Sequence, residues 1–352
     1  MPDKVIQDLL VTKPGTRKLQ GYAFDPSLSL QIDTAPINHM IYEIPWESLE
    51  AGPVGEYIEV IDYDPTVNKF YEPVNLDHPY LLAQNGLAPA ESNPQFHQQM
   101  VYAVAMTTIK NFESALGRKI LWAPRLVSNN AVFQEYVPRL RIYPHAMREA
   151  NAYYSPEKKA ILFGYFESMP AANTIEMPGA YVFTCLSHDI IAHEVTHAIL
   201  DGLYPRFSEA SNPDVLAFHE AFADIVSLFQ HFTFPDVLKH QIANTRGDLA
   251  AQNELGKLAQ QFGSAIGGYG SLRDALGAVD PDTKQWKAKE PNGDEYRQIM
   301  EPHDRGSILV SAVFEAFITI YKSRVKDLLR IATGGTGVLP QGELHPDLVN
   351  RL

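Results

Sequence analysis

The residues best suited to chemistry lie in one short stretch of the chain. Residues 193–197 read His-Glu-Val-Thr-His, so two imidazoles stand four positions apart. On a helix, residues i and i+4 lie about 6 Å apart on one face, and both rings can reach a single metal ion. Glu194 lies roughly 100° further round the helix, where a carboxylate can take a proton from a metal-bound water. The spacing predicts a metal site with a base beside it.

A zinc ion held by two histidines needs a third protein ligand if its fourth position is left to water. Glu220 is the best candidate, because it lies on the next segment with helical periodicity and shares a face with Asp224. Carboxylates outside the ligand set commonly orient ligating histidines. We therefore expect Zn²⁺ on His193, His197 and Glu220, with Asp224 hydrogen-bonded to His197.

Several nearby groups are not expected to bind the metal. His219 points away from the face of Glu220, and Glu209 falls in an expected loop. His231 lies 11 residues beyond Glu220, about 16 Å along a helix axis. The chain has one cysteine, Cys185, so no internal disulfide can form and no cysteine-based zinc knuckle is available. Histidines and carboxylates are the expected ligands.

The segments that carry these residues have clear helix signals. Ser187 is a suitable N-cap and Gly202 a suitable stop, so a helix is expected over 187–202, with its apolar residues opposite the histidines. An Asn-Pro pair begins a second helix, expected over 213–232. Further helices are expected at 96–116, 248–263 and 305–332, and strands at 57–61, 69–71, 119–122, 140–143, 150–154, 159–163 and 181–184.

This order of elements predicts an α+β fold of two lobes. A β-rich N-terminal extension covers 1–90 and ends in an expected linker at 84–93. An α/β lobe over 91–206 carries the two histidines, and an α-helical lobe over 207–352 carries the third ligand. The metal cleft is expected between the lobes. The last residues predict the start of a helix, which suggests that the parent chain is longer.

Composition bounds the class of protein. Of 352 residues, 45% are hydrophobic and 20% charged, which is ordinary for a globular chain. The formal net charge of −13 argues against a nucleic-acid partner. No apolar run approaches the roughly 20 residues that a membrane helix needs, and the N-terminus lacks the features of a signal peptide. We expect a cytoplasmic protein without a membrane segment, with secretion by another route left open.

Together, these motifs resemble the thermolysin-like neutral metallopeptidases, the group whose third zinc ligand is a glutamate. The resemblance covers roughly residues 96 to 320 and rests on the His-Glu-x-x-His motif followed by Glu220 and Asp224. It implies a two-lobed α+β fold with the zinc cleft between the lobes. It also implies hydrolysis of peptide bonds in peptide or protein substrates, with Glu194 as general base.

Other positions gain roles only through this resemblance. Asn151 and Ala152 are similar to the edge strand that holds the substrate backbone. Arg273 ends a Ser-Leu-Arg segment whose arginine hydrogen-bonds a substrate carbonyl. His303 matches the histidine that stabilises the oxyanion, and Tyr204 is the nearest candidate for the tyrosine that assists it.

The sequence also departs from the family pattern. Cys185-Leu186-Ser187 replaces a glycine pair ahead of the active-site helix, and the acidic calcium loops are absent, so no double calcium site is expected. Gln298 stands where an aspartate should orient His303. Either Glu301 or Asp304 is expected to take over that contact.

Three other functions remain open. An aminopeptidase of the same zinc class would need an acidic site for a free amine, and its Gly-Ala-Met-Glu-Asn signature is missing. An inactive zinc-binding interaction protein would have no need for Glu194. A non-peptidase zinc hydrolase would have no use for a strand like that at Asn151 or for Arg273.

Overall fold

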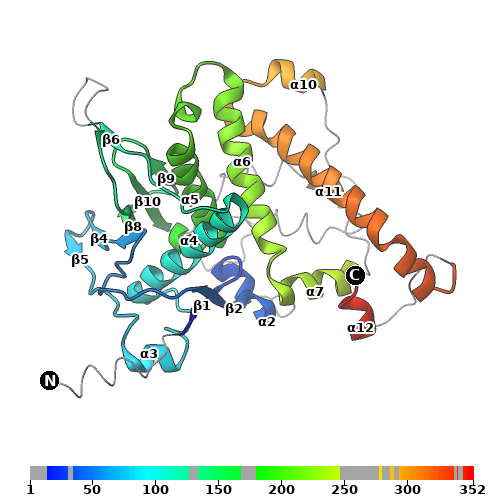
Figure 1. Ribbon diagram of the computed structural model, residues 1–352, viewed down its shortest axis with the longest axis horizontal. Coiled ribbons are helices and arrows are strands. Elements are labelled where there is room, and N and C mark those ends of the chain that lie inside the picture. The colour runs from blue at the N-terminus through cyan, green and yellow to red at the C-terminus, as the bar shows by residue number, and fades with distance from the viewer. Residues whose placement is uncertain are drawn as a thin grey trace.

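The protein is a mixed α+β structure, which confirms the predicted class. Figure 1 shows the labelled strands, β1 to β10, toward one end of the molecule, with helices packed against them and α11 extending away. The computed structural model describes residues 14–30, 35–126, 134–167, 180–245, 277–279, 286–288, 293–336, 339 and 344–352. Within these residues, no helix is both long and apolar enough to cross a membrane.

The main sheet is mixed and has five strands. In chain order these are β3 (Ile58–Val60), β8 (Leu140–Met147), β9 (Ala152–Ser155), β10 (Ala160–Glu167) and β11 (Tyr181–Phe183). Strands β3 and β10 run parallel to β8 on either side of it. Both β9 and β11 pair antiparallel with the edge of β10 that faces away from β8. β9 pairs with the first half of β10 and β11 with the second half.

Gly164 lies where that edge of β10 passes from β9 to β11. Its N–H donates to the carbonyl of Asn151 at 2.8 Å. A Cβ atom at this position would lie 2.2 Å from the carbonyl oxygen of Glu149, so a larger residue would push the chain ahead of β9 away. The glycine thus allows β9 to lie close against β10.

The other strands form two-stranded pairs. They are β1 (Thr16–Tyr22) with β2 (His39–Pro45), β4 (Tyr63–Asp64) with β5 (Lys69–Phe70), β6 (Arg125–Leu126) with β7 (Gln134–Glu135), and β12 (Gly277–Val279) with β13 (Trp286–Ala288). One hydrophobic cluster runs from Leu19 in β1 to Ile318 in α11. The described residues between Leu19 and Leu76 therefore share a core with later parts of the chain.

Helix α4 (Pro94–Leu116) lies at the centre of this core. Its start is capped by Asn93, whose side chain accepts a hydrogen bond from the N–H of Gln95, and Gly117 ends it in the left-handed conformation at φ 65°. Its buried residues contact the β1–β2 pair, the main sheet and α5. The expected linker at 84–93 is irregular, but it is fastened to α4 through hydrogen bonds to Gln99 and His97.

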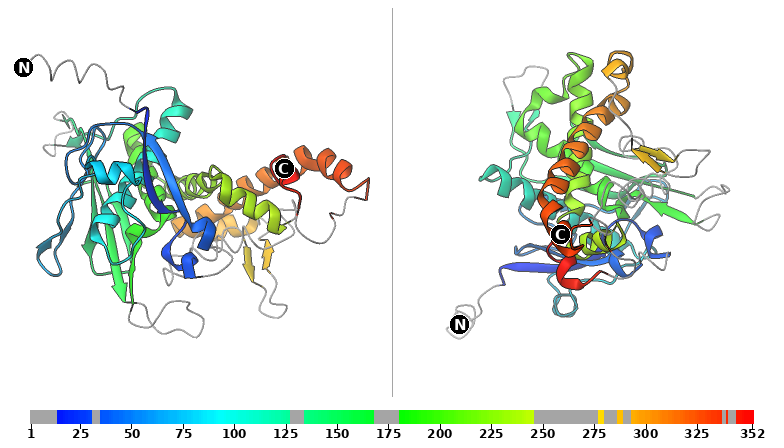
Figure 2. Two further views of the ribbon diagram at one scale, coloured as in Figure 1. Left: turned by 90° about the horizontal axis from the view of Figure 1, so that it is seen from below. Right: turned by 90° about the vertical axis from the view of Figure 1, so that its right-hand side faces the viewer.

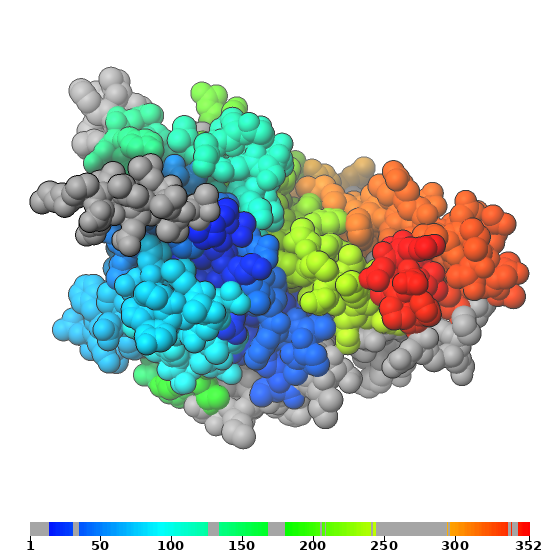
Figure 3. Space-filling view, turned by 60° about the horizontal axis from the view of Figure 1, so that its bottom comes forward, coloured from blue at the N-terminus to red at the C-terminus, as the bar shows by residue number. Residues whose placement is uncertain are grey.

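The remaining helices and short helical turns complete the fold. They are α2 (Ala35–Asn38), α3 (Pro79–Ala83), α5 (His188–Leu203), α6 (Pro213–His231), α7 (Pro235–Thr245), α10 (Gly293–Gln298), α11 (Pro302–Ala332) and α12 (Pro346–Val349), with short 3-10 turns η1 (Pro26–Leu30), η2 (Thr184–Leu186) and η3 (Pro205–Ser208). Helix α5 packs between α4 and α6, and α11 lies along α6. The C-terminal α12 rests against α7, as Figures 2 and 3 show.

Most predicted elements are confirmed. The helices expected at 96–116, 187–202, 213–232 and 305–332 and six of the seven strands are present within a few residues, while 248–263 lies outside the described residues. The strand expected at 119–122 is wrong. Ile120 and Trp122 are buried, but on an irregular segment whose indole N–H donates to the carbonyl of Tyr57 at 2.9 Å. These apolar residues fill the core without pairing in a sheet.

Candidate metal centre

Helices α5 and α6 pack side by side and run in opposite directions. Late residues of α5 therefore meet early residues of α6: His197 contacts His219, whereas Asp189, near the start of α5, contacts Ser227. This pairing places the helical face carrying His193 and His197 against α6. It brings residues of the two segments singled out in the sequence into one group.

His193, His197 and Glu220 converge on one point, and we call them the open group because part of their surface is exposed. The Nε2 atoms of the two histidines lie 2.8 Å apart. Oε2 of Glu220 lies 3.2 Å from Nε2 of His193 and 3.3 Å from Nε2 of His197. Ligands about 2.05 Å from a tetrahedral zinc ion are themselves about 3.3 Å apart. The three atoms are thus spaced almost as zinc ligands.

The second nitrogen of each histidine has its own partner. Nδ1 of His193 lies 2.9 Å from Oδ1 of the buried Asp224. Nδ1 of His197 lies 2.5 Å from Nδ1 of His219, whose ring stacks on it. Burial alone would lower the pKa of His193, but its hydrogen bonds to Asp224 and Glu220 raise it well above the ordinary value. Asp224 accepts from Nδ1–H, which leaves Nε2 as the nitrogen that can bind an ion once its proton is released. This is how ligating histidines are held in metal sites.

Two predictions about these partners are wrong. Asp224 contacts His193 and not His197, and His219, which was expected to lie away from the site, contacts His197. The reason is the direction of the helices. Asp224 is one turn further along α6 than Glu220, and because the helices are antiparallel, that turn faces the earlier histidine of α5.

Glu194 lies beside the open group without belonging to it. Its side chain is 7% exposed, and its Oε2 accepts a hydrogen bond from the backbone N–H of Tyr154 in β9 at 2.7 Å. Burial raises the pKa of its carboxyl group to about 7. The hydroxyl of Tyr154 and Nζ of Lys159 both donate to Asp201 at 2.7 Å, which fastens this part of the sheet to α5. The contact with Tyr154 thus holds Glu194 through one of its two carboxylate oxygens, Oε2.

His303, at the start of α11, reaches the same group. Its Nε2 lies 3.2 Å from Oε2 of Glu220, and this hydrogen bond raises the pKa of His303 to about 9. Its Nδ1 lies 2.8 Å from Oε1 of Glu301, which also caps α11 by accepting from the N–H of Asp304. Of the two acids expected to orient His303, Glu301 makes the contact.

The other predicted residues fall in different places. Ala152 is in β9, two residues before Tyr154, and Asn151 immediately precedes the strand. Arg273 lies outside the described residues. Tyr204 follows the last residue of α5, is half-exposed and packs on Phe207, and its role stays a prediction.

The donor set suits a catalytic zinc ion, which takes two imidazoles, one carboxylate and a water. Glu209 is exposed and takes no part, and His231 is buried against Asp189. A second group that could hold a metal, formed by His97, His145 and Cys185, was not predicted from the sequence. Neither a scan against models of known protein families nor a search of curated proteins finds a match to this chain.

Proposed function

We propose that this chain is a zinc-dependent metallopeptidase of the thermolysin-like kind, with two lobes on either side of a zinc cleft. In this proposal His193, His197 and Glu220 hold the ion and Glu194 is the general base. One observation carries the proposal. Three atoms that can serve as ligands converge on one point from two antiparallel helices, and a strand holds a buried carboxylate beside them.

The chemistry follows from the residues around that point. A zinc ion bound there would polarise a peptide carbonyl and lower the pKa of a water molecule. Glu194 takes a proton from the water through Oε1, because its Oε2 already accepts from Tyr154, and then gives that proton to the leaving amine. With Oε2 of Glu220 bound to the ion, Nε2–H of His303 would be released from Glu220 and would donate to the developing oxyanion, while Glu301 orients the ring through Nδ1.

An extended peptide suits the strand beside this group. β9 pairs with β10 along one edge and directs the N–H of Tyr154 away from β10, toward Glu194. In an antiparallel strand alternate residues direct their backbone groups to the same side, so Ala152 faces the same way as Tyr154. A substrate segment that added to β9 as a further strand would lie beside Glu194. The carbonyl of Asn151 is directed to Gly164, which makes Ala152 the better backbone contact.

The test compares cleavage of a blocked peptide with cleavage of the same peptide with a free N-terminus, each with and without a chelator. A metalloendopeptidase cleaves both, and the chelator abolishes cleavage. Glu194→Gln should retain zinc and lose about 10²–10⁴-fold in turnover, the usual contribution of a general base. Glu209→Gln is the matched control, because Glu209 is exposed and outside the open group.

The alternatives give different results in the same assay. Cleavage of the free-N-terminal peptide alone would make the enzyme an aminopeptidase. Zinc binding without cleavage of either peptide would leave an interaction protein or a hydrolase for another substrate. Full activity of the Glu194→Gln variant would refute the mechanism.

A further inference from the structure

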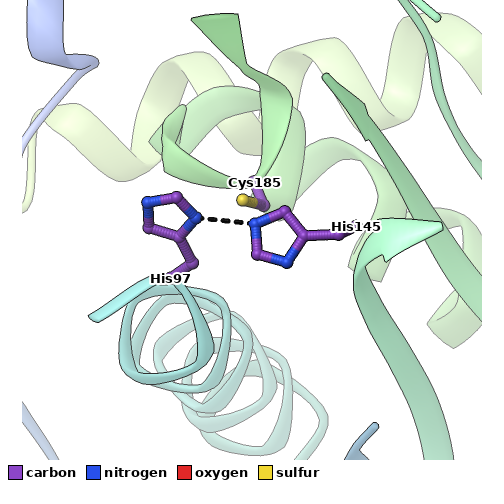
Figure 4. A group of neighbouring side chains, drawn as sticks. All are labelled: His97, His145 and Cys185. Atoms are coloured by element: carbon purple, nitrogen blue, oxygen red, sulfur yellow. Dashed lines mark hydrogen bonds between the residues drawn. The ribbon is translucent and has the colours of Figure 1, made fainter. Parts of the chain in front are cut away.

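A second cluster of ligand atoms lies in the core of the molecule, away from the open group. His97 of α4, His145 of β8 and Cys185 of η2 point toward one another, as Figure 4 shows. Their ligand atoms all lie within 4.8 Å of one another, and all three residues are buried. We call these three residues the buried group. They come from three elements that are far apart in the sequence.

The protons of the two histidines can be placed from their outer contacts. Nε2 of His97 lies 2.8 Å from the carbonyl oxygen of Glu91, and a carbonyl only accepts, so this nitrogen carries the proton. Nδ1 of His145 lies 2.6 Å from Oδ1 of Asp62, whose other oxygen accepts from the side chain of Gln98 at 2.8 Å. Asp62 is therefore held as an acceptor-only carboxylate, and Nδ1 of His145 donates to it.

The inner nitrogens consequently face each other as lone pairs. Nδ1 of His97 lies 2.8 Å from Nε2 of His145. Two lone pairs at this distance repel, so the contact needs either a shared extra proton or a cation between them. A shared proton would involve only the two ring nitrogens and would not explain why the sulfur of Cys185 lies beside them. A metal ion uses all three atoms, and it explains why each ring has its outer nitrogen fixed by a carboxylate or a carbonyl.

We propose that the buried group binds a divalent transition-metal ion, with zinc the expected occupant. Two imidazoles and one thiolate are ligands that zinc accepts. On binding, the ion displaces the proton of the Cys185 thiol to solvent, and a metal–sulfur bond replaces the S–H bond. The charges then balance, because two positive charges meet the thiolate and the carboxylate of Asp62. A neutral total suits a site in which Asp62 is only 6% exposed.

The position of the group suggests a structural role. Cys185 precedes the first residue of α5, His188, by three positions. An ion at the buried group would join the start of α5 to α4 and to the main sheet. Helix α5 carries His193, Glu194 and His197, so the ion would hold the helix on which the open group depends.

The chain offers a selective spectroscopic test, because Cys185 is its only cysteine. Metal-free protein is loaded with Co²⁺, and the near-ultraviolet band for charge transfer from thiolate to cobalt is recorded. The proposal predicts this band in the wild type and its loss in Cys185→Ser. The neighbouring Thr184→Ser, a conservative change at another buried position, is the matched control and should keep the band.

The open group is tested separately in the same experiment. A variant with both His193→Gln and Glu220→Gln should keep the thiolate band and bind one equivalent of metal, whereas the wild type should bind two. One equivalent in the wild type with the band present would mean that the open group fails. A folded wild type without the band would overturn this proposal and leave His97 and His145 as a pair sharing a proton.

Discussion

The open group and the buried group share one geometric feature and differ in everything around it. In each, two imidazole nitrogens face each other 2.8 Å apart, with the outer nitrogen of each ring hydrogen-bonded. The third ligand of the open group is Glu220, whose side chain is 19% exposed, and Glu194 lies beside it as a spare carboxylate. The third ligand of the buried group is Cys185, and all three of its members are buried.

In the two proposals, this difference assigns catalysis to the open group and a structural role to the buried group. A catalytic metal needs an open coordination position and a base within reach of it. In the proposed function, water takes the open position of an ion at the open group and Glu194 is the base. The buried group has thiolate chemistry and complete burial, which favour tight binding and slow exchange of the ion. The two proposals thus give two uses to a similar pair of facing imidazoles.

A third cluster of histidines, His188 and His231, is a useful reference. His231 contacts the carboxylate of Asp189, and Nδ1 of His188 lies 3.2 Å from the hydroxyl of Tyr42. The two rings meet tilted at 56°. Histidines gathered in a core do not by themselves indicate a metal. The proposal for the buried group rests on two ring nitrogens that face each other as lone pairs.

The largest expected effect comes from removing the third ligand of the open group. Glu220→Gln should abolish metal-dependent turnover, a loss greater than the roughly 10²–10⁴-fold due to a missing general base, because the ion is lost as well. The measurement is the rate of peptide cleavage at saturating zinc. Cys185→Ser should keep turnover while it remains folded. Equal losses in the two variants would contradict the division of roles.

The next effect is on stability. An ion bound to the buried group at about 1,000 times its dissociation constant stabilises the fold by about 4 kcal/mol. A chelator should therefore lower the unfolding free energy of Glu220→Gln by about this amount, and that of the wild type by this amount plus the contribution of the ion at the open group. In Cys185→Ser only the contribution of the open group should remain. The measurement is urea unfolding with and without chelator, and a chelator effect confined to proteins with an intact Glu220 would reverse the assignment.

Asp224→Asn should lower the metal affinity of the open group and leave that of the buried group unchanged. Asp224 accepts from His193, and loss of such a carboxylate usually lowers metal affinity about 10–100-fold. Zinc titration of the variant should show this loss at the open group, with the thiolate–cobalt band of the buried group unchanged. Asp236→Asn, at an exposed position on α7, is the control. An unchanged affinity would show that Asp224 has no part in holding His193.

The smallest expected effect is on the pH dependence of stability, and it concerns the cluster of His188 and His231. Burial lowers the pKa of His188 to about 3, whereas an unfolded histidine titrates near 6.5. Between these values the unfolded chain binds one more proton, so His188 contributes to stability in full above pH 6.5 and less as the pH falls toward 3. The slope is at most about 1.4 kcal/mol per pH unit. His188→Gln should reduce the acid sensitivity of urea unfolding, and an unchanged pH profile would contradict the neutral assignment of this ring.

Much of the open group could be predicted from the sequence because its residues lie on two helices. Helical spacing places His193 beside His197 and Glu220 beside Asp224 without any knowledge of tertiary contacts. The relative direction of the helices is tertiary information, and the partner of Asp224 was predicted wrongly for that reason. His219 was missed for the same reason, although it immediately precedes Glu220.

The buried group could not be predicted in this way. His97, His145 and Cys185 lie 48 and 40 residues apart along the chain. No local period relates them, and only the packing of α4 against the sheet and η2 brings them together. The apolar segment around Trp122 shows a related limit, since burial alone does not distinguish a strand from an irregular segment that fills the core.

The central claim is that His193, His197 and Glu220 share one ion while Glu194 stays free beside it. A crystal structure of the zinc-loaded protein with anomalous diffraction at the zinc edge tests it most directly. The account predicts a peak about 2 Å from Nε2 of both histidines and from Glu220, with the N–H of Tyr154 still donating to Glu194. Zinc that avoided this point, or a Glu194 that joined the ligands in place of Glu220, would contradict it.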